Sequence, residues 1–118
     1  MSRKGGRSVR GPVVVREERT EHRPEGELDP VEALIHRARK LRQRGDARGA
    51  IVLLRQACSH DEWRARTFTL LGALLSDEGR HEEAAMALSH ARWLRQRAGE
   101  ATRAEVTARL LETELRSC

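Results

Sequence analysis

The chain has 118 residues, enough for one small domain, with a net charge of +5 and 38% apolar residues. No apolar run approaches the ~20 residues that a membrane-spanning helix needs, and no signal-peptide core follows the basic N-terminus. Cys58 and Cys118 have neither metal-site nor disulfide spacing, so we expect a reduced, cytoplasmic protein that binds no metal or other cofactor.

Residues 1–28 differ from the rest of the chain. They contain glycine and proline without a helical apolar period. Five basic residues precede Glu17, and acidic residues outnumber basic ones from there to Glu27. Such a segment buries too little apolar surface to offset the entropy lost on ordering, so we expect a disordered arm. A basic arm that contacts RNA, DNA or an acidic partner is the functional alternative, and the triplet 13–15 of valines could instead pair as a strand or dock on a partner.

Residues 29–118 are predicted to form one all-α domain. Asp29 followed by proline is typical of a helix start, and Gly45 and Gly79 suit the left-handed position just after a helix end. A turn is expected at 59–62, and its residues can cap the start of the next helix. The five expected helices cover residues 29–44, 47–59, 63–77, 81–97 and 100–116.

Each expected helix carries an apolar stripe with helical spacing. The first four stripes consist of Leu34, Ala38 and Leu41; Ala50, Ile51, Leu54 and Ala57; Phe68, Leu71, Gly72, Leu74 and Leu75; and Ala84, Ala85, Leu88, Ala91 and Leu94. The fifth consists of Ala101, Ala104, Ala108, Leu111 and Leu115, broadened by Val106 and Leu110. Trp63 and Trp93 are expected to fill gaps between helices.

The segment from Gly45 to Ala57 has an echo 34 positions later, from Gly79 to Ala91. The echo extends to the preceding helices, where Leu34 matches Phe68, Ala38 matches Gly72 and Leu41 matches Leu75. Small residues at matching heights allow neighbouring antiparallel helices to approach closely, with large residues filling the space beside each contact. The pattern predicts one helical hairpin built twice.

A period of 34, two helices per unit and this order of small and large residues resemble the tetratricopeptide repeat (TPR). The second unit, 65–98, matches the family's signature better, at Phe68, Leu71, Gly72, Leu75, Gly79, Ala84, Leu88 and Ala91. The first unit, 31–64, has Arg37 in place of a large apolar residue, and both units lack the family's proline, with Glu62 and Gln96 there. The resemblance implies an all-α, right-handed helical-hairpin solenoid of two repeats capped by the fifth helix; another type of helical-hairpin solenoid is the alternative.

The resemblance also implies a concave groove, lined by the first helix of each unit, that holds a peptide or helix of a partner protein. By position, the groove residues are Glu32, Ile35, Arg39, Arg42 and Gln43 in the first unit and Arg66, Thr69, Ala73, Ser76 and Asp77 in the second. Arg39 and Arg42 lie three apart on one helical face and suit a carboxylate or an acidic segment. We therefore expect a protein-binding adaptor or small chaperone-like module; a merely solvated helix face is the alternative.

A nucleic-acid-associated protein is the rival function. The pI is about 10.5 and five basic residues lie between Arg37 and Arg44, although aromatic residues are few. No catalytic constellation can be assembled, so we do not expect an enzyme. Two repeats make a thin solenoid, which leaves pairing with another copy or with an obligate partner protein as an alternative to a minimal domain.

Overall fold

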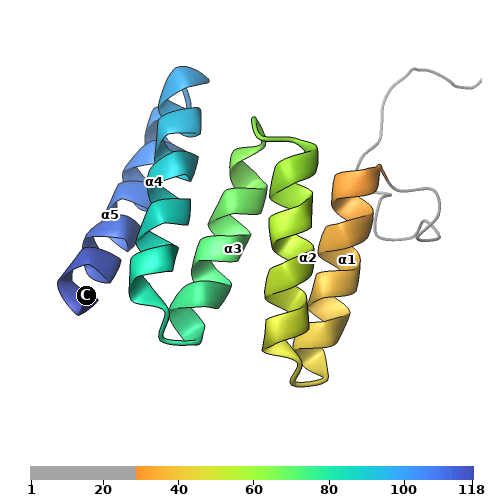
Figure 1. Ribbon diagram of the computed structural model, residues 1–118. Helices are drawn as coiled ribbons and strands as arrows, with labels where there is room; N and C mark the ends of the chain where they lie inside the picture. Colours follow the sequence, from red (N-terminus) through yellow and green to blue (C-terminus); the bar gives the residue numbers. More distant parts are fainter. Residues whose placement is uncertain (1–28) are drawn as a thin grey trace, which may run out of the picture.

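The computed structural model describes residues 29–118, and the predicted arm of residues 1–28 lies outside them. Within the described part the chain forms five α-helices and no strand (Figure 1). They are α1 (Pro30–Gln43), α2 (Ala47–His60), α3 (Ala65–Asp77), α4 (His81–Arg97) and α5 (Ala101–Ser117). The all-α class predicted from the sequence is confirmed.

The helices pack in chain order, each mainly against its neighbours in the sequence (Figure 1). Contacts are more extensive between α1 and α2, between α3 and α4 and between α4 and α5 than between α2 and α3. The molecule measures 60 × 34 × 20 Å along its principal axes. A helix rises 1.5 Å per residue, so even α4 and α5 are only about 25 Å long. The long axis of the molecule therefore runs across the row of helices.

Three helices end in the same way, each followed by a glycine with positive φ. These glycines are Gly45, Gly79 and Gly99, with φ of 86°, 76° and 76°. After α3, for example, the glycine N–H donates to the carbonyl of Ser76 and the N–H of Arg80 donates to the carbonyl of Leu75, both at 2.9 Å. These two hydrogen bonds form a Schellman motif, in which the residue just after the helix end adopts a left-handed conformation. Glycine is favoured there because it adopts positive φ without a steric cost. The predicted ends of these three helices are therefore correct to within one residue.

The turn between α2 and α3 contains no glycine, and there the predicted helix bounds are wrong. Ser59 and His60, expected in a turn, belong to α2, and α3 begins at Ala65 instead of Trp63. The N–H of Trp63 donates to the carboxylate of Asp61 at 3.0 Å. Because this hydrogen bond occupies the carboxylate within the turn, it caps the turn itself, and the helix starts two residues later.

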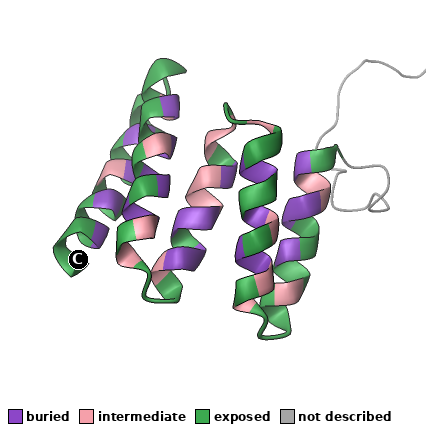
Figure 2. Ribbon diagram, viewed as in Figure 1, coloured by how far each residue is buried: buried purple, intermediate pink, exposed green. Residues whose placement is uncertain are grey.

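The main core lies among α1 to α4, and its buried faces turn towards the neighbouring helices (Figure 2). All residues of the predicted stripes of α2 and α4 are buried. In the predicted stripes of α1 and α3, only Leu41 and Phe68 are partly buried, and the other residues are buried. A Cβ atom at Gly72 would lie 2.8 Å from Cγ of Leu88. The close approach of α3 to α4 at this small residue agrees with the prediction.

The predicted buried face of α5 is correct only in part. Ala104 and Leu111 are buried as expected, together with Thr107 and Glu114. Of the residues expected there, Ala101, Val106, Leu110 and Leu115 are exposed and Ala108 is half-buried. The face is rotated towards Glu114, whose carboxylate makes polar contacts with α3 and with the start of α4.

Both tryptophans are surface residues, so the expectation that they fill gaps between helices is wrong. The exposed fraction is 66% for Trp63 and 44% for Trp93. Their rings face one another instead, with centroids 5.9 Å apart.

We expect the substitution Thr67→Val to raise the free energy of unfolding by about 1 kcal/mol. Thr67 is fully buried, and its Oγ1 has no hydrogen-bond partner among the described residues. Valine keeps the shape and removes the unpaired hydroxyl. Urea denaturation measures the change. Thr107→Val is the matched control, because the buried hydroxyl of Thr107 donates to Arg103 O at 2.8 Å; an equal gain in both variants would contradict the explanation.

Candidate functional site

Two ion pairs connect α1 to α3, the helices predicted to line the groove. Near the helix starts, Nη1 of Arg66 lies 2.7 Å from Oε2 of Glu32. Near the helix ends, the guanidinium of Arg42 contacts the carboxylate of Asp77. The partners are 34 and 35 positions apart in the chain. It follows that α1 and α3 run parallel, side by side, at close to the offset seen in the sequence.

A small pocket, here called the α1–α3 pocket, lies along the helices between these ion pairs. It is lined by Ile35, Ala38, Arg39, Arg42, Leu54, Leu70 and Leu74, and its volume is about 50 Å³. The two arginines are the only charged residues in this lining. Since one water occupies ~30 Å³ in the liquid, the pocket has room for one or two waters or for one small aliphatic side chain.

Ile35 was expected to contact a partner from the groove, and the structure corrects this expectation. Its side chain is 1% exposed and belongs to the main core. It lies three positions before Ala38, on the inner side of α1, and so contributes only to the floor of the α1–α3 pocket.

The two arginines of the predicted carboxylate clamp differ in their surroundings. Arg42 is already paired with Asp77, so half of the predicted clamp is occupied from within the chain. Arg39 is exposed, and its side chain makes no ion pair or hydrogen bond within residues 29–118. The pocket therefore presents one uncompensated guanidinium beside an apolar floor.

The remaining predicted groove residues divide into two groups. Gln43 and Ala73 are exposed on α1 and α3. Thr69 is half-buried and its hydroxyl donates to Ala65 O at 3.0 Å. The hydroxyl of Ser76 donates to the carboxylate of Glu114 at 2.8 Å. The Thr69 hydroxyl also accepts from Nη2 of Arg95 in α4 at 3.3 Å. Thr69 and Ser76 thus contribute to contacts between helices, and only the first group is available to a partner.

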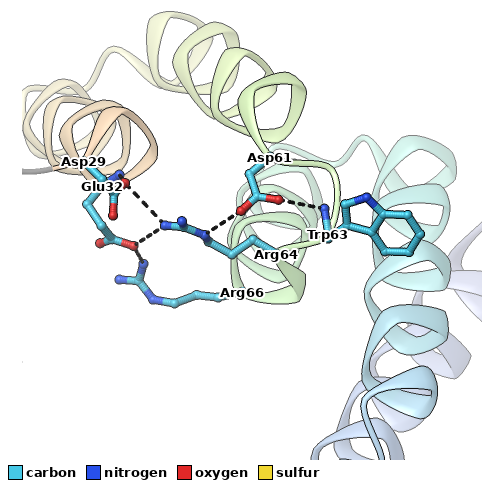
Figure 3. A network of polar contacts seen from close by, with 6 residues as sticks. All are labelled: Asp29, Glu32, Asp61, Trp63, Arg64 and Arg66. Atoms are coloured by element: carbon cyan, nitrogen blue, oxygen red, sulfur yellow. Dashed lines mark hydrogen bonds and ion pairs between the residues drawn. The ribbon is translucent and has the colours of Figure 1, made fainter.

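A polar network joins α1 to the α2–α3 turn (Figure 3). The guanidinium of Arg64 lies 3.4 Å from Asp29, 3.3 Å from Glu32 and 3.3 Å from Asp61. The N–H of Glu32 donates to the Asp29 carboxylate at 2.9 Å, and this hydrogen bond is the main reason why the pKa of Asp29 is lowered. Because the network and the Glu32–Arg66 pair share one carboxylate, they hold the starts of α1 and α3 together.

Glu114 of α5 is a structural residue that the sequence analysis missed. Its carboxylate is 6% exposed; one oxygen accepts from Ser76 and the other lies 2.8 Å from Nδ1 of His81. The hydrogen bond with His81 is the main cause of the lowered pKa of Glu114. The spacing of Glu114 from Leu111 and Ala104 places it on their helical face, and this was the available signal.

Two observations on the described residues concern metal binding and cysteine reactivity. No group of three or more histidine, cysteine, aspartate or glutamate side chains in residues 29–118 is arranged to hold a metal ion. Burial raises the pKa of the Cys58 thiol to about 11, which keeps it protonated and unreactive at neutral pH. In the same part of the chain, no helix has the length and apolar character needed to cross a membrane.

Comparison of the sequence with known protein families and with curated proteins gave no match. The candidate site is therefore defined by its geometry: an apolar floor, Arg39 at its edge, and internally neutralised charges at either end of the α1–α3 pocket.

Proposed function

We propose that the chain is a protein-interaction module built as a short, right-handed solenoid of TPR-like helical hairpins. In this arrangement α1–α2 and α3–α4 are the two repeats and α5 is the cap. Three observations support it: the parallel register of α1 and α3, the recurrent glycine turns after α1, α3 and α4, and the close contact of Gly72 with Leu88. Such modules present a groove to a partner segment, so the proposal gives the α1–α3 pocket its function.

The partner segment would be a peptide or helix of another protein, and the chain would hold it in the manner of an adaptor or small chaperone. The observation that carries this proposal is the unpaired Arg39 beside the apolar floor of the α1–α3 pocket. A guanidinium forms strong, paired hydrogen bonds with a carboxylate, and the 50 Å³ recess selects a small aliphatic group. The preferred ligand is therefore an acidic residue or C-terminal carboxylate next to alanine or valine.

Nucleic-acid binding by the arginine-rich first helix is less well supported. The charge of Arg42 is offset by Asp77, and the neighbouring Arg66 of α3 is offset by Glu32. A phosphate chain following α1 would meet these carboxylates. The N-terminal arm, the other part of this alternative, lies outside the described residues.

Arg39→Glu should weaken binding of such peptides about ten-fold or more, because a hydrogen bond to a charged group is worth ~1.5–3 kcal/mol and the variant adds repulsion. Peptides selected from a display library with the full-length chain provide the ligands, and titration calorimetry measures the affinity. Arg48→Glu makes the same change at an exposed position on α2 and should leave the affinity within about two-fold.

Asp77→Asn gives a gain-of-function arm of the same experiment. It frees Arg42 for the ligand, and because the ion pair is about half exposed on both sides, its loss should cost no more than ~1 kcal/mol of stability. Affinity for acidic peptides should rise. Selected peptides without an acidic group, or equal losses in Arg39→Glu and Arg48→Glu, would refute the proposed site.

A further inference from the structure

The two tryptophans of the chain lie together on the surface although they come from different segments. Trp63 belongs to the α2–α3 turn and Trp93 to α4, and their rings are tilted by 33° at a centroid distance of 5.9 Å. Figure 3 shows the indole of Trp63 turned away from the Arg64 network and towards α4. Large exposed aromatic rings gain little for the fold, so a binding role is the natural function to test.

The rings are held in place by a set of contacts that use no carboxylate. The guanidinium of Arg97 lies 5.5 Å from the ring centroid of Trp63 and 4.9 Å from that of Trp93, within cation–π range of both. The ring of His90 stacks on Trp93 at 5.7 Å and meets the edge of Phe68 at 4.3 Å. We call these five residues the aromatic cluster.

A recess of about 290 Å³ adjoins the aromatic cluster. It is lined by Cys58, Ser59, Glu62, Phe68 and His90. Small-molecule sites begin at ~300 Å³, so the recess is close in size to the smallest of them. It shares no residue with the α1–α3 pocket.

The charge next to the two indole rings is that of Arg97, and the exposed Glu62 lines the adjoining recess. Arg97 is exposed on the last turn of α4 and forms no ion pair with a carboxylate within the described residues. Elsewhere the exposed arginines of α1 to α4 often face a carboxylate, as Arg55 and Arg80 face Glu83. A guanidinium without a carboxylate partner next to two indole rings suits a ligand with both an aromatic surface and negative charge.

We propose that the aromatic cluster is a second binding site, which stacks the bases of single-stranded nucleic acid on Trp63 and Trp93 while Arg97 faces its phosphates. Stacking platforms combined with positive charge are the usual means of binding single strands without sequence preference. The charge favours this ligand over a proline-rich peptide, which would dock on the indoles but leave Arg97 without a counter-charge.

Intrinsic fluorescence tests this proposal directly, because both tryptophans of the chain lie in the aromatic cluster. The full-length chain is titrated with short oligodeoxythymidine or oligouridine. We expect the tryptophan emission to be quenched as the oligonucleotide binds, and the affinity to fall as salt is raised. Absence of quenching, or quenching by proline-rich or acidic peptides but not by oligonucleotides, would overturn the proposal.

Variants separate stacking from general attraction to a basic chain. In anisotropy titrations with a labelled oligonucleotide, Trp63→Ala should bind about ten-fold more weakly, and Trp63→Phe should recover part of this loss. Arg97→Gln should weaken binding more than Arg48→Gln, which removes the same charge from α2. Trp63 is 66% exposed, so its replacement leaves the core intact, as a thermal melt verifies. Full affinity in Trp63→Ala, or equal losses in the two arginine variants, would show that the cluster is not the site.

Discussion

Replacing Gly72 by alanine should lower the free energy of unfolding by about 1–3 kcal/mol, the usual cost of an overpacked core. At an ordinary helical position the same change stabilises a protein by ~1 kcal/mol, because alanine is the better helix former. Here the added Cβ would lie 2.8 Å from Cγ and 2.9 Å from Cδ2 of Leu88. Leu88 is only 2% exposed, so its side chain is enclosed by neighbouring residues. The sign of the change, measured by urea denaturation, therefore reports the α3–α4 contact.

A double-mutant cycle isolates that contact. Leu88→Ala alone should cost about 2–5 kcal/mol through the cavity that it leaves. In the double variant the new methyl group enters this cavity. The stability loss of the double variant should therefore be smaller, by at least ~0.5 kcal/mol, than the summed losses of the two single variants. The exposed neighbour Ala73 provides the control: Ala73→Gly should cost ~1 kcal/mol from helix propensity alone. A stabilising Gly72→Ala would show that α3 and α4 do not pack this closely.

Removing the carboxylate of Glu114 should also have a large effect. We expect Glu114→Ala to lower the free energy of unfolding at neutral pH by about 2 kcal/mol, because the buried oxygens that contact Ser76 and His81 are lost. These contacts attach α5 to the rest of the domain, where the apolar cluster around Leu111 is small. Glu112→Ala, at an exposed position of the same helix, should change the stability by less than ~0.5 kcal/mol.

The loss should depend on pH. The pKa of Glu114 is lowered in the folded protein from its ordinary value of 4.5, so the carboxylate binds a proton more readily in the unfolded chain. Its contribution to stability is full above pH 4.5 and disappears as the pH falls through the folded-state pKa. The difference between wild type and Glu114→Ala should therefore shrink in acid. A difference that stays constant from neutral pH down to pH 3 would mean that Glu114 acts only through packing.

The sequence predicts most helix bounds well because their causes are local. Glycine with positive φ ends α1, α3 and α4, and the side chains of Asp29 and Asp46 accept from the N–H groups of residues 32 and 49 at the starts of α1 and α2. The turn without glycine, between α2 and α3, has a weaker signal, and it is the place where the bounds were wrong.

The candidate site depended on contacts that no local pattern contains. Arg42 and Asp77 are 35 residues apart, so their pairing follows only from the parallel register of α1 and α3. The resemblance to the repeat family placed Ile35 in the groove by position, whereas its side chain lies in the core. In α5 the apolar pattern predicted the buried face only in part, because that face also contains Glu114, which is hydrogen-bonded to α3. Arg39 was predicted as a binding residue. Its lack of an ion pair follows only from the structure, which shows that the neighbouring arginine is paired with a carboxylate.

Amide chemical-shift mapping tests the proposed function most directly. The full-length, isotope-labelled chain is titrated with an acidic peptide selected on it from a display library. The α1–α3 pocket predicts the largest shift changes at Arg39, Leu70, Ala73 and Leu74, and their loss in Arg39→Glu. Shift changes centred on α2 and α4, with α1 and α3 undisturbed, would show that the partner binds another face of the molecule.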